Sequence, residues 1–261
     1  MQVYLISSKV LSSDRFRFQQ EQLARLGLEY VLIDPVTPVS LSIPANHSYW
    51  WRWQRPLRPV ECAILQSHQI AWRAIAQSSF PSMVIEDDIL LSKDTAVFLD
   101  SLSRHGNARM VILETRGRKK LFSRRAELRP SLRMLYVNRS GAAAYVLWPS
   151  TAKQLLRMTA NRGLLADAAL GNLKGNGVYQ VIPPLAFQAD CCQRYGLMAP
   201  FSLSSSVSSV SRPRSDDYSY WLRLQWIARR IFAQASIAFS FVAHGLGSSY
   251  EEPLPRPCDF R

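Results

Sequence analysis

The order of strand-like and helix-like segments constrains the fold of this chain more than any other feature. Apolar runs at residues 2–7, 28–34 and 82–91 predict strands, and amphipathic patterns at residues 13–27 and 59–77 predict helices between them. Strands that alternate with helices are typical of an open α/β sheet. Ligands of such sheets bind beyond the carboxyl ends of the strands, so we expect a functional site at this edge.

The α/β pattern continues to about residue 200. Further strands are predicted at residues 108–116, 134–138, 142–148 and 179–188. A helix is predicted at residues 149–161, and a short helix followed by a turn at residues 164–177. Residues 35–59 carry Pro, Ser and several Trp, which predicts a long ordered loop. Residues 116–133 are rich in Arg and Lys and predict a loop over or beside the site. We therefore expect one domain over residues 1–200.

The composition changes after this domain, so residues 201–261 form a separate C-terminal segment. Residues 201–215 are rich in Ser and predict a linker, and residues 216–245 predict a basic, Trp-bearing amphipathic helix. The tail at residues 251–261 is predicted to be loose. Such a helix either lies on an anionic membrane surface or packs against the domain, and we favour the membrane.

Three consecutive carboxylates lie in the strand predicted at residues 82–91. Glu86, Asp87 and Asp88 repel one another, and each is costly to remove from water. Carboxylate oxygens suit Mg²⁺ or Mn²⁺, and an ion held by few protein ligands commonly shares its coordination shell with a diphosphate. The alternative is a strand that ends in solvated acids. We favour a metal and diphosphate role because the acids lie at the edge where a ligand is expected.

Other side chains near this edge have two readings each. Arg15 and Arg17 follow the first strand and either contact a phosphate group or lie on an exposed helix face. His68 either touches a ligand or is a buried, hydrogen-bonded residue. The basic residues 116–133 either bind an anionic partner or form a solvated loop.

The net charge narrows the class of partner. Lys and Arg number 32 against 19 acidic residues, which gives a formal charge of +13 and favours nucleic acid, an acidic membrane or a phosphorylated ligand. The chain lacks a Gly-rich phosphate-binding motif and an aromatic stacking platform, which weakens the nucleic-acid reading. We expect four reduced cysteines, no signal peptide, no membrane span and a cytosolic location.

Several segments together resemble glycosyltransferase family 25, the bacterial lipooligosaccharide galactosyltransferase family. They are "VYLIS", "DRFRFQQEQLARLGLEYVLIDPV", "LRPVECAILQSHQIAWRAI" and "MVIEDDILL". The motif "EC…SH" followed by "IEDD" is the most specific part, and the resemblance covers roughly residues 1–190. The chain departs from the family pattern at Pro59 and Val60, before Glu61, and in the short stretch at residues 161–167.

The resemblance implies a GT-A-like, Rossmann-like mixed sheet flanked by helices and a UDP-sugar donor, typically UDP-galactose. Asp88 would bind Mn²⁺ or Mg²⁺ on the diphosphate, and Gln188 would help close the metal site. The donor-binding residues that it implies are Ile6, Ser7, Arg15, His68, Glu86 and Asp87. Glu86 or Asp87 would reach the ribose or the sugar.

The resemblance also implies an inverting reaction, which needs a carboxylate base for the acceptor hydroxyl. Asp167 and Glu114 match family positions, and we favour Asp167 as the base, while Glu114 could bind donor sugar or acceptor hydroxyls. The expected acceptor is a lipooligosaccharide or other lipid-linked glycan at the inner face of the cytoplasmic membrane. A nucleic-acid-binding protein without chemistry and an inactive family relative that serves as a scaffold are the alternatives.

Overall fold

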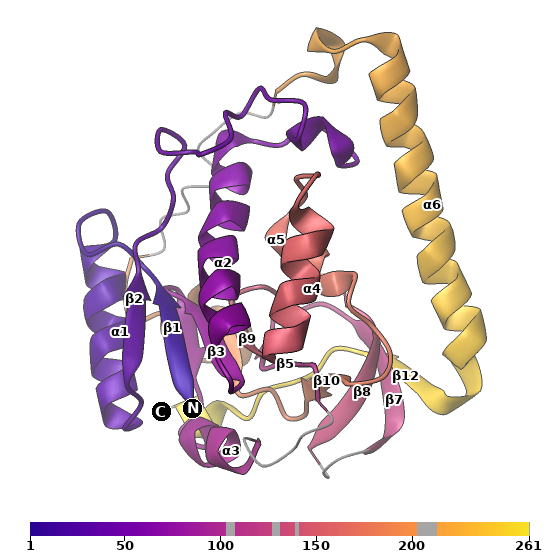
Figure 1. Ribbon diagram of the computed structural model, residues 1–261. Coiled ribbons are helices and arrows are strands. Elements are labelled where there is room, and N and C mark those ends of the chain that lie inside the picture. Colours follow the sequence, from indigo (N-terminus) through magenta and orange to yellow (C-terminus); the bar gives the residue numbers. More distant parts are fainter. Residues whose placement is uncertain (103–107, 127–130, 139–140, 203–212, 261) are drawn as a thin grey trace.

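A nine-stranded mixed sheet lies at the centre of the molecule (Figure 1). The computed structural model describes residues 1–102, 108–126, 131–138, 141–202 and 213–260. In chain order the strands of this sheet are β1 (Gln2–Ile6), β2 (Tyr30–Ile33), β3 (Ser82–Glu86), β5 (Met110–Ile112), β7 (Lys120–Ala126), β8 (Leu132–Val137), β9 (Ala144–Leu147), β10 (Val178–Val181) and β12 (Ser248–Glu251).

The strand directions gather several carboxyl ends at one edge. The spatial order is β12-β7-β8-β10-β5-β9-β3-β1-β2. β1 is parallel to β2 and β3, and β5 is parallel to β10. β9 is antiparallel to both β3 and β5, so all of these strands except β9 run in the same direction. The ends of β1, β3 and β5 therefore meet where the acidic residues lie.

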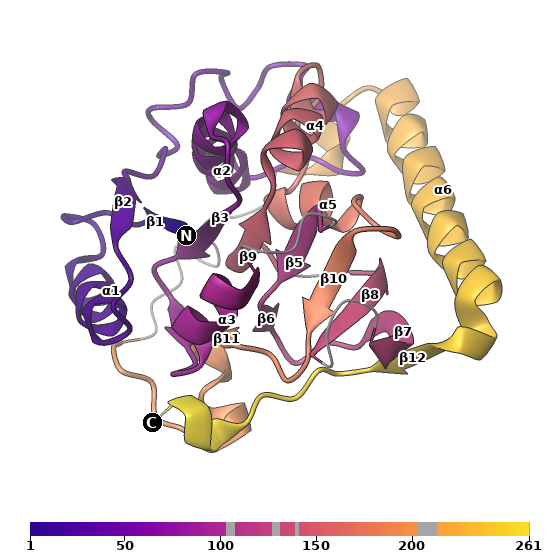
Figure 2. The same ribbon diagram turned by 60° about the horizontal axis from the view of Figure 1, so that its bottom comes forward.

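Helices cover both faces of the sheet, which confirms the predicted α/β sheet flanked by helices. They are α1 (Ser13–Arg25), α2 (Pro59–Gln77), α3 (Thr95–Leu102), α4 (Pro149–Thr159), α5 (Ala166–Gly171) and α6 (Tyr220–His244). One core cluster joins α2, α4 and α5 to the sheet, and a second cluster joins α1 and α3 to its other face (Figures 1 and 2). Apolar side chains alternate along the buried strands and thus serve both cores.

A second, three-stranded sheet departs from the sequence prediction. It consists of β4 (Ile89–Leu91), β11 (Ala186–Gln188) and β6 (Glu114–Thr115), in that order. The single strand predicted at residues 82–91 is therefore wrong, because the chain turns at Asp87 and Asp88. The strands predicted at 108–116 and 179–188 break in the same way. All three continuations pair with one another beyond the edge of the large sheet.

The prediction of a loop over residues 116–133 is also wrong, because β7 and the start of β8 lie within it. Leu121 and Phe122 are buried, and β7 pairs with β8 and β12. Lys120 is buried as well, and its ammonium group donates to the side-chain oxygen of Gln180 at 2.7 Å and to the carbonyl of Glu114 at 3.2 Å. The charged residues of this segment suggested an exposed loop. Lys120 is instead a buried strand residue whose charge is stabilised by hydrogen bonds inside the protein.

The C-terminal tail is packed, so the predicted loose tail is wrong. β12 forms the edge of the large sheet. A 3-10 turn at Pro257–Phe260 then places Phe260 against Phe187, with ring centroids 4.6 Å apart. The backbone N–H of Lys93 donates to the carbonyl of Asp259 at 2.8 Å.

Helix α6 is present where a C-terminal helix was expected, and it packs against the domain along one face only. The indole N–H of Trp226 donates to the carbonyl of Trp51 at 2.8 Å, and His244 stacks on Tyr136. The opposite face is apolar and exposed, and it includes Trp221, Leu224, Ile227, Ile231, Phe239 and Val242. Within the described ranges no helix has the length and apolarity of a membrane span. Most of the predicted linker, residues 203–212, lies outside the described residues.

The loop between β2 and α2 is ordered, as predicted, and it supports the C-terminal helix. It contains a 3-10 turn at Trp50–Arg52, and Trp50 is buried. The hydroxyl of Tyr49 donates to the carbonyl of Thr159 at 2.7 Å, at the end of α4. Gly163 packs so closely on Trp50 that a Cβ atom would collide with the indole ring. The remaining 3-10 turns lie at Ala189–Cys191, Gln193–Tyr195, Ser215–Asp217 and Gly245–Gly247.

Candidate active site

Asp87 is held in place by the first strand and the first helix. Its Oδ2 atom accepts hydrogen bonds from Ser12 Oγ at 2.6 Å and Ser7 Oγ at 3.2 Å, and Arg15 Nη1 lies 3.5 Å from its Oδ1 atom. The side-chain amide of Gln19 donates to its backbone carbonyl at 3.1 Å. Two hydroxyl donors and a guanidinium group therefore fix the orientation of this carboxylate. Ile6, the last residue of β1, is buried beside this turn and pairs in register with Glu86.

Glu86 is oriented by a buried chain of polar groups. Tyr145 Oη accepts from the indole N–H of Trp72 at 2.8 Å and lies 3.0 Å from His68 Nδ1. Its own proton is then available to Nδ1, which leaves the N–H of His68 on Nε2, 3.0 Å from Glu86 Oε1. The His68 side chain is only 1% exposed while that of Glu86 is 27% exposed. His68 is therefore too buried to contact a ligand itself, and it orients Glu86, whose carboxylate is accessible.

Asp88 and Gln188 meet across the second sheet. The amide of Gln188 donates to Asp88 Oδ2 at 3.0 Å. The other oxygen, Oδ1, is buried and has no hydrogen-bond partner among the described residues. Burial, followed by the negative charge of Glu86, raises the pKa of Asp88 to about 8, against the lowering effect of the Gln188 hydrogen bond. A buried carboxylate oxygen without a partner beside other acids is a position that a cation would stabilise.

The residues around Asp88 fit a metal ion that is coordinated mainly by water and phosphate oxygens and by few protein side chains. No group of three or more His, Cys, Asp or Glu side chains with metal-binding geometry occurs in the part of the chain that the structure describes. Mg²⁺ and similar hard ions commonly take one or two carboxylates and complete their shell with water and phosphate oxygens. Asp88 is the carboxylate that this arrangement offers.

Glu114 lies beneath the acid cluster and is fully buried. Its Oε1 atom accepts hydrogen bonds from the backbone N–H groups of Ala143 at 2.6 Å and Ala144 at 3.3 Å. Burial raises the pKa of Glu114 to about 7, and the positive charge of Lys120 opposes this rise. The carboxylate thus bonds the backbone at the start of β9 and is 1% exposed, so it has no open face toward an acceptor.

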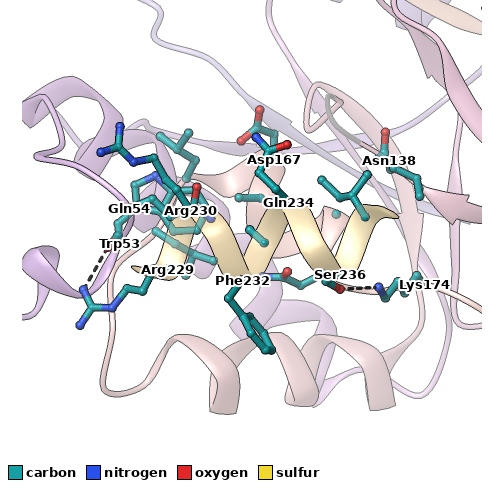
Figure 3. A pocket seen from close by; sticks show the side chains of 18 of the residues that line it. Trp53, Gln54, Asn138, Asp167, Lys174, Arg229, Arg230, Phe232, Gln234 and Ser236 are labelled. Carbon is teal, nitrogen blue, oxygen red and sulfur yellow. Dashed lines mark hydrogen bonds between the residues drawn. The ribbon is translucent and has the colours of Figure 1, made fainter. Parts of the chain in front are cut away.

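Asp167 occupies the first turn of α5 and lines a groove of about 910 Å³ between α6 and the body of the protein (Figure 3). Burial raises the pKa of Asp167 above its usual value, while the N–H of Ala168 and the charge of Arg118 act in the opposite direction. The negative charge of Glu86 also raises the pKa of Asp167. A half-buried carboxylate with a raised pKa suits proton abstraction near neutral pH.

The basic segment begins over this site. Arg116 forms an ion pair with Asp190 at 2.8 Å and interacts electrostatically with Asp88 and Glu114. Arg118 interacts with Asp167. These guanidinium groups are placed where phosphate oxygens beside the acid cluster could be neutralised.

The sequence model of glycosyltransferase family 25, described as an LPS biosynthesis protein, matches residues 1–170. The chain belongs to glycosyltransferase family 25. A search of curated proteins found no match. Among solved structures, a mannose-1-phosphate geranyltransferase from Thermus thermophilus is similar, with 10% identity and a TM-score of 0.32 over 69% of this chain and 72% of that chain.

Membership in family 25 makes this protein a glycosyltransferase of lipopolysaccharide biosynthesis, acting in general on a sugar donor and a glycan acceptor. The matched region runs from β1 into α5 and therefore includes the acid cluster, Glu114 and Asp167. Gln188 and α6 lie outside it.

The sequence analysis missed two residues that support the acid cluster, Ser12 and Gln19. Gln19 is completely buried and also donates to the carbonyl of Ile89 at 2.6 Å. Gln22, three residues later, accepts from the N–H of Leu91 at 2.7 Å. Two Gln residues on the otherwise apolar face of α1 were the available signal, since buried amides need partners.

Proposed function

We propose that this protein transfers a hexose, galactose in the first instance, from a UDP-sugar to a hydroxyl group of a lipooligosaccharide or related glycan. The reaction is metal-dependent and inverting. The observation that carries the proposal is the buried Asp88 Oδ1 atom, which lacks a hydrogen-bond partner among the described residues and lies in an acid cluster at the ligand edge. The family match supports the transferase class.

Asp88, with Gln188 donating to its second oxygen, would hold Mn²⁺ or Mg²⁺. When bound, the ion supplies Lewis-acid stabilisation of the departing UDP. Arg15, which pairs with Asp87, and Arg116, which interacts with Asp88, would add positive charge near the diphosphate. Glu86 and Asp87 accept hydrogen bonds from ribose or sugar hydroxyl groups, since both carboxylates are only partly buried.

Asp167 acts as the general base. It removes the proton of the acceptor hydroxyl group as the acceptor oxygen forms a bond to the anomeric carbon of the donor. The bond from that carbon to UDP breaks, and its electron pair leaves with UDP. Attack from the side opposite to UDP inverts the anomeric configuration. The raised pKa of Asp167 strengthens it as a base near pH 7.

The exposed apolar face of α6 supports a location at a membrane surface. Ile231, Phe239 and Val242 lie on this face, and the basic residues Arg223 and Arg230 belong to the same helix. Helices with an apolar face and basic neighbours lie in the interface plane of anionic bilayers. We place the protein on the inner face of the cytoplasmic membrane, with α6 as the contact.

The test is UDP release from UDP-galactose, UDP-glucose and their N-acetyl forms, with Mn²⁺ or with EDTA. We expect release that needs the metal and is lost in Asp88→Ala, whereas the exposed control Asp94→Ala resembles wild type. The preferred donor identifies the sugar. Absence of binding and turnover with every UDP-sugar in Mn²⁺ would contradict the proposal, and the basic surface should then be tested against nucleic acid.

A further inference from the structure

The groove beside α6 carries an unbalanced charge. Its volume is about 910 Å³, and it lies between α6, the loop that holds Trp53, and the α4–α5 region (Figure 3). Five cationic residues line it, namely Arg52, Arg162, Lys174, Arg229 and Arg230. Asp167 is the one carboxylate in the lining as far as the structure describes it. Figure 3 shows Arg229 and Arg230 toward one end, Lys174 toward the other, and Asp167 between them.

Three of the cations, Arg52, Arg162 and Arg229, are close enough to repel one another. Burial lowers the pKa of Arg229, and the positive charges of Arg52 and Arg162 lower it further. The guanidinium group of Arg229 is committed to structure, because it donates to the carbonyls of Trp51 at 2.8 Å and Trp53 at 3.0 Å. Arg52 and Arg162 are exposed. An anion bound between them would relieve the repulsion, as a cation would relieve the acid cluster.

The other groups of the groove suit a saccharide. Trp53 and Phe232 offer aromatic surface, and the amides of Gln54 and Gln234 offer hydrogen-bond donors and acceptors. Apolar surface with a few placed polar groups is typical of small-molecule sites. Asp167, the carboxylate favoured as the base, opens onto the same space, so a sugar hydroxyl bound here could reach it.

We propose that this groove is the acceptor subsite and that it recognises an anionic group of the acceptor saccharide, a phosphate or a carboxylate, through Arg52 and Arg162. This inference rests on the proposed transferase function. Lys174 is held by Ser236 at 3.1 Å and Ser240 at 3.3 Å, and Arg229 by backbone carbonyls, so these two cations keep α6 in place. Arg52 binds the acceptor anion together with the terminal nitrogens of Arg162, whose Nε atom donates to the carbonyl of Met158 at 3.3 Å.

The experiment measures calorimetric binding of deacylated lipopolysaccharide core oligosaccharide to the full chain. Three forms of this probe are compared: intact, dephosphorylated and carboxyl-reduced. We expect wild type to bind the intact form at least about tenfold more tightly than the form that lacks the recognised anion. If the dephosphorylated probe binds more weakly, the recognised anion is a phosphate. If the carboxyl-reduced probe binds more weakly, it is a carboxylate.

Substitutions at Arg52 and Arg162 test whether the difference in probe affinity arises in the groove. Arg52→Gln with Arg162→Gln should remove the difference between intact and anion-free probe, and Arg162→Lys should keep part of it because the charge remains. The control is Arg25→Gln with Arg157→Gln, which removes the same charge from exposed positions outside the groove. All four positions are exposed, and a thermal melt of each variant confirms folding.

Two results would overturn the inference. One is equal binding of all three probe forms by wild type. The other is an equal loss in the control variant, which would reveal general electrostatic attraction only. UDP release by wild type from UDP-galactose, UDP-glucose and their N-acetyl forms is measured in parallel. If UDP is released but intact and anion-free probes bind equally, only the acceptor subsite is refuted. If no UDP is released but the intact probe still binds more tightly, the proposed transfer is refuted and the anion-binding site stands.

Discussion

Replacing Asp88 with Asn should make the metal-free protein more stable while removing the metal site. The pKa of Asp88 rises from 3.8 to about 8, mainly through burial and then through Glu86. At pH 7 this carboxyl group is protonated in the folded chain and ionised in the unfolded chain. Taking up this proton on folding lowers the free energy of unfolding by at most about 4 kcal/mol. The figure is about 1.4 kcal/mol for each pH unit between 3.8, the unfolded pKa, and pH 7.

The expected gain is smaller than this limit because Asp88 is only partly buried. We expect Asp88→Asn to raise the free energy of unfolding by about 1–3 kcal/mol, or the melting temperature by about 2–8 °C. The side-chain carbonyl of Asn can still accept the hydrogen bond from Gln188.

The sign of the pH dependence follows from the raised pKa. A carboxyl group whose pKa is raised on folding stabilises the fold fully below its unfolded pKa, near 4, and loses that contribution as pH rises through about 8. The difference in melting temperature between Asp88→Asn and wild type should therefore be small at pH 4 and largest above pH 8. Metal binding to wild type should strengthen over the same range, because the proton must leave Asp88.

The assay is thermal denaturation between pH 4 and 9 in EDTA and in Mn²⁺ with UDP. Mn²⁺ with UDP should raise the melting temperature of wild type and leave that of Asp88→Asn unchanged. Asp94→Asn is the control, since it removes an exposed carboxylate elsewhere. An Asp88→Asn variant that is less stable than wild type in EDTA at pH 8 would refute the argument that this charge is uncompensated.

Three further predictions concern the base, a close contact and the membrane face. Asp167→Asn should lower the transfer rate by about 10²–10⁴-fold with UDP affinity retained, and equal loss of both would contradict its role as base. Gly163→Ala should cost about 1–3 kcal/mol in chemical denaturation because its side chain would collide with the adjacent indole ring, whereas Gly245→Ala, which has open space, should cost far less. Ile231→Ser with Phe239→Ser should weaken co-sedimentation with anionic lipid vesicles while the melting temperature stays near that of wild type, and unchanged sedimentation would argue against α6 as the contact.

Periodicity and strand-end chemistry were sufficient to predict the sheet, its flanking helices and the acid cluster. β1 and α2 lie where the pattern placed them, and β3 is the first half of the strand predicted at residues 82–91. The two strands contribute apolar residues to both cores, and α2 contributes to one. The second sheet could not be predicted, since the turn at Asp87 and Asp88 and the pairing of β4 with β11 depend on contacts almost 100 residues apart in sequence. β7 was missed because a buried, hydrogen-bonded Lys120 looks like surface charge.

In the candidate active site, too, some residues could be predicted from the sequence and others could not. Charge and position single out Glu86, Asp87 and Asp88, but the groups that orient them come from distant segments. His68, on α2, contacts Glu86 directly through Nε2, and Tyr145 of β9 contacts the other ring nitrogen. The groove beside α6 was also hidden, because it exists only when the C-terminal helix returns to the domain.

The most direct test of the central claim is a calorimetric titration of UDP into wild-type protein, once with Mn²⁺ and once with EDTA. The claim is that the acid cluster holds a metal and a diphosphate together. It predicts binding of UDP with Mn²⁺, loss of that binding in EDTA, and release of a proton from Asp88 near pH 7. Equal binding of UDP in EDTA, or absence of binding in Mn²⁺, would contradict it.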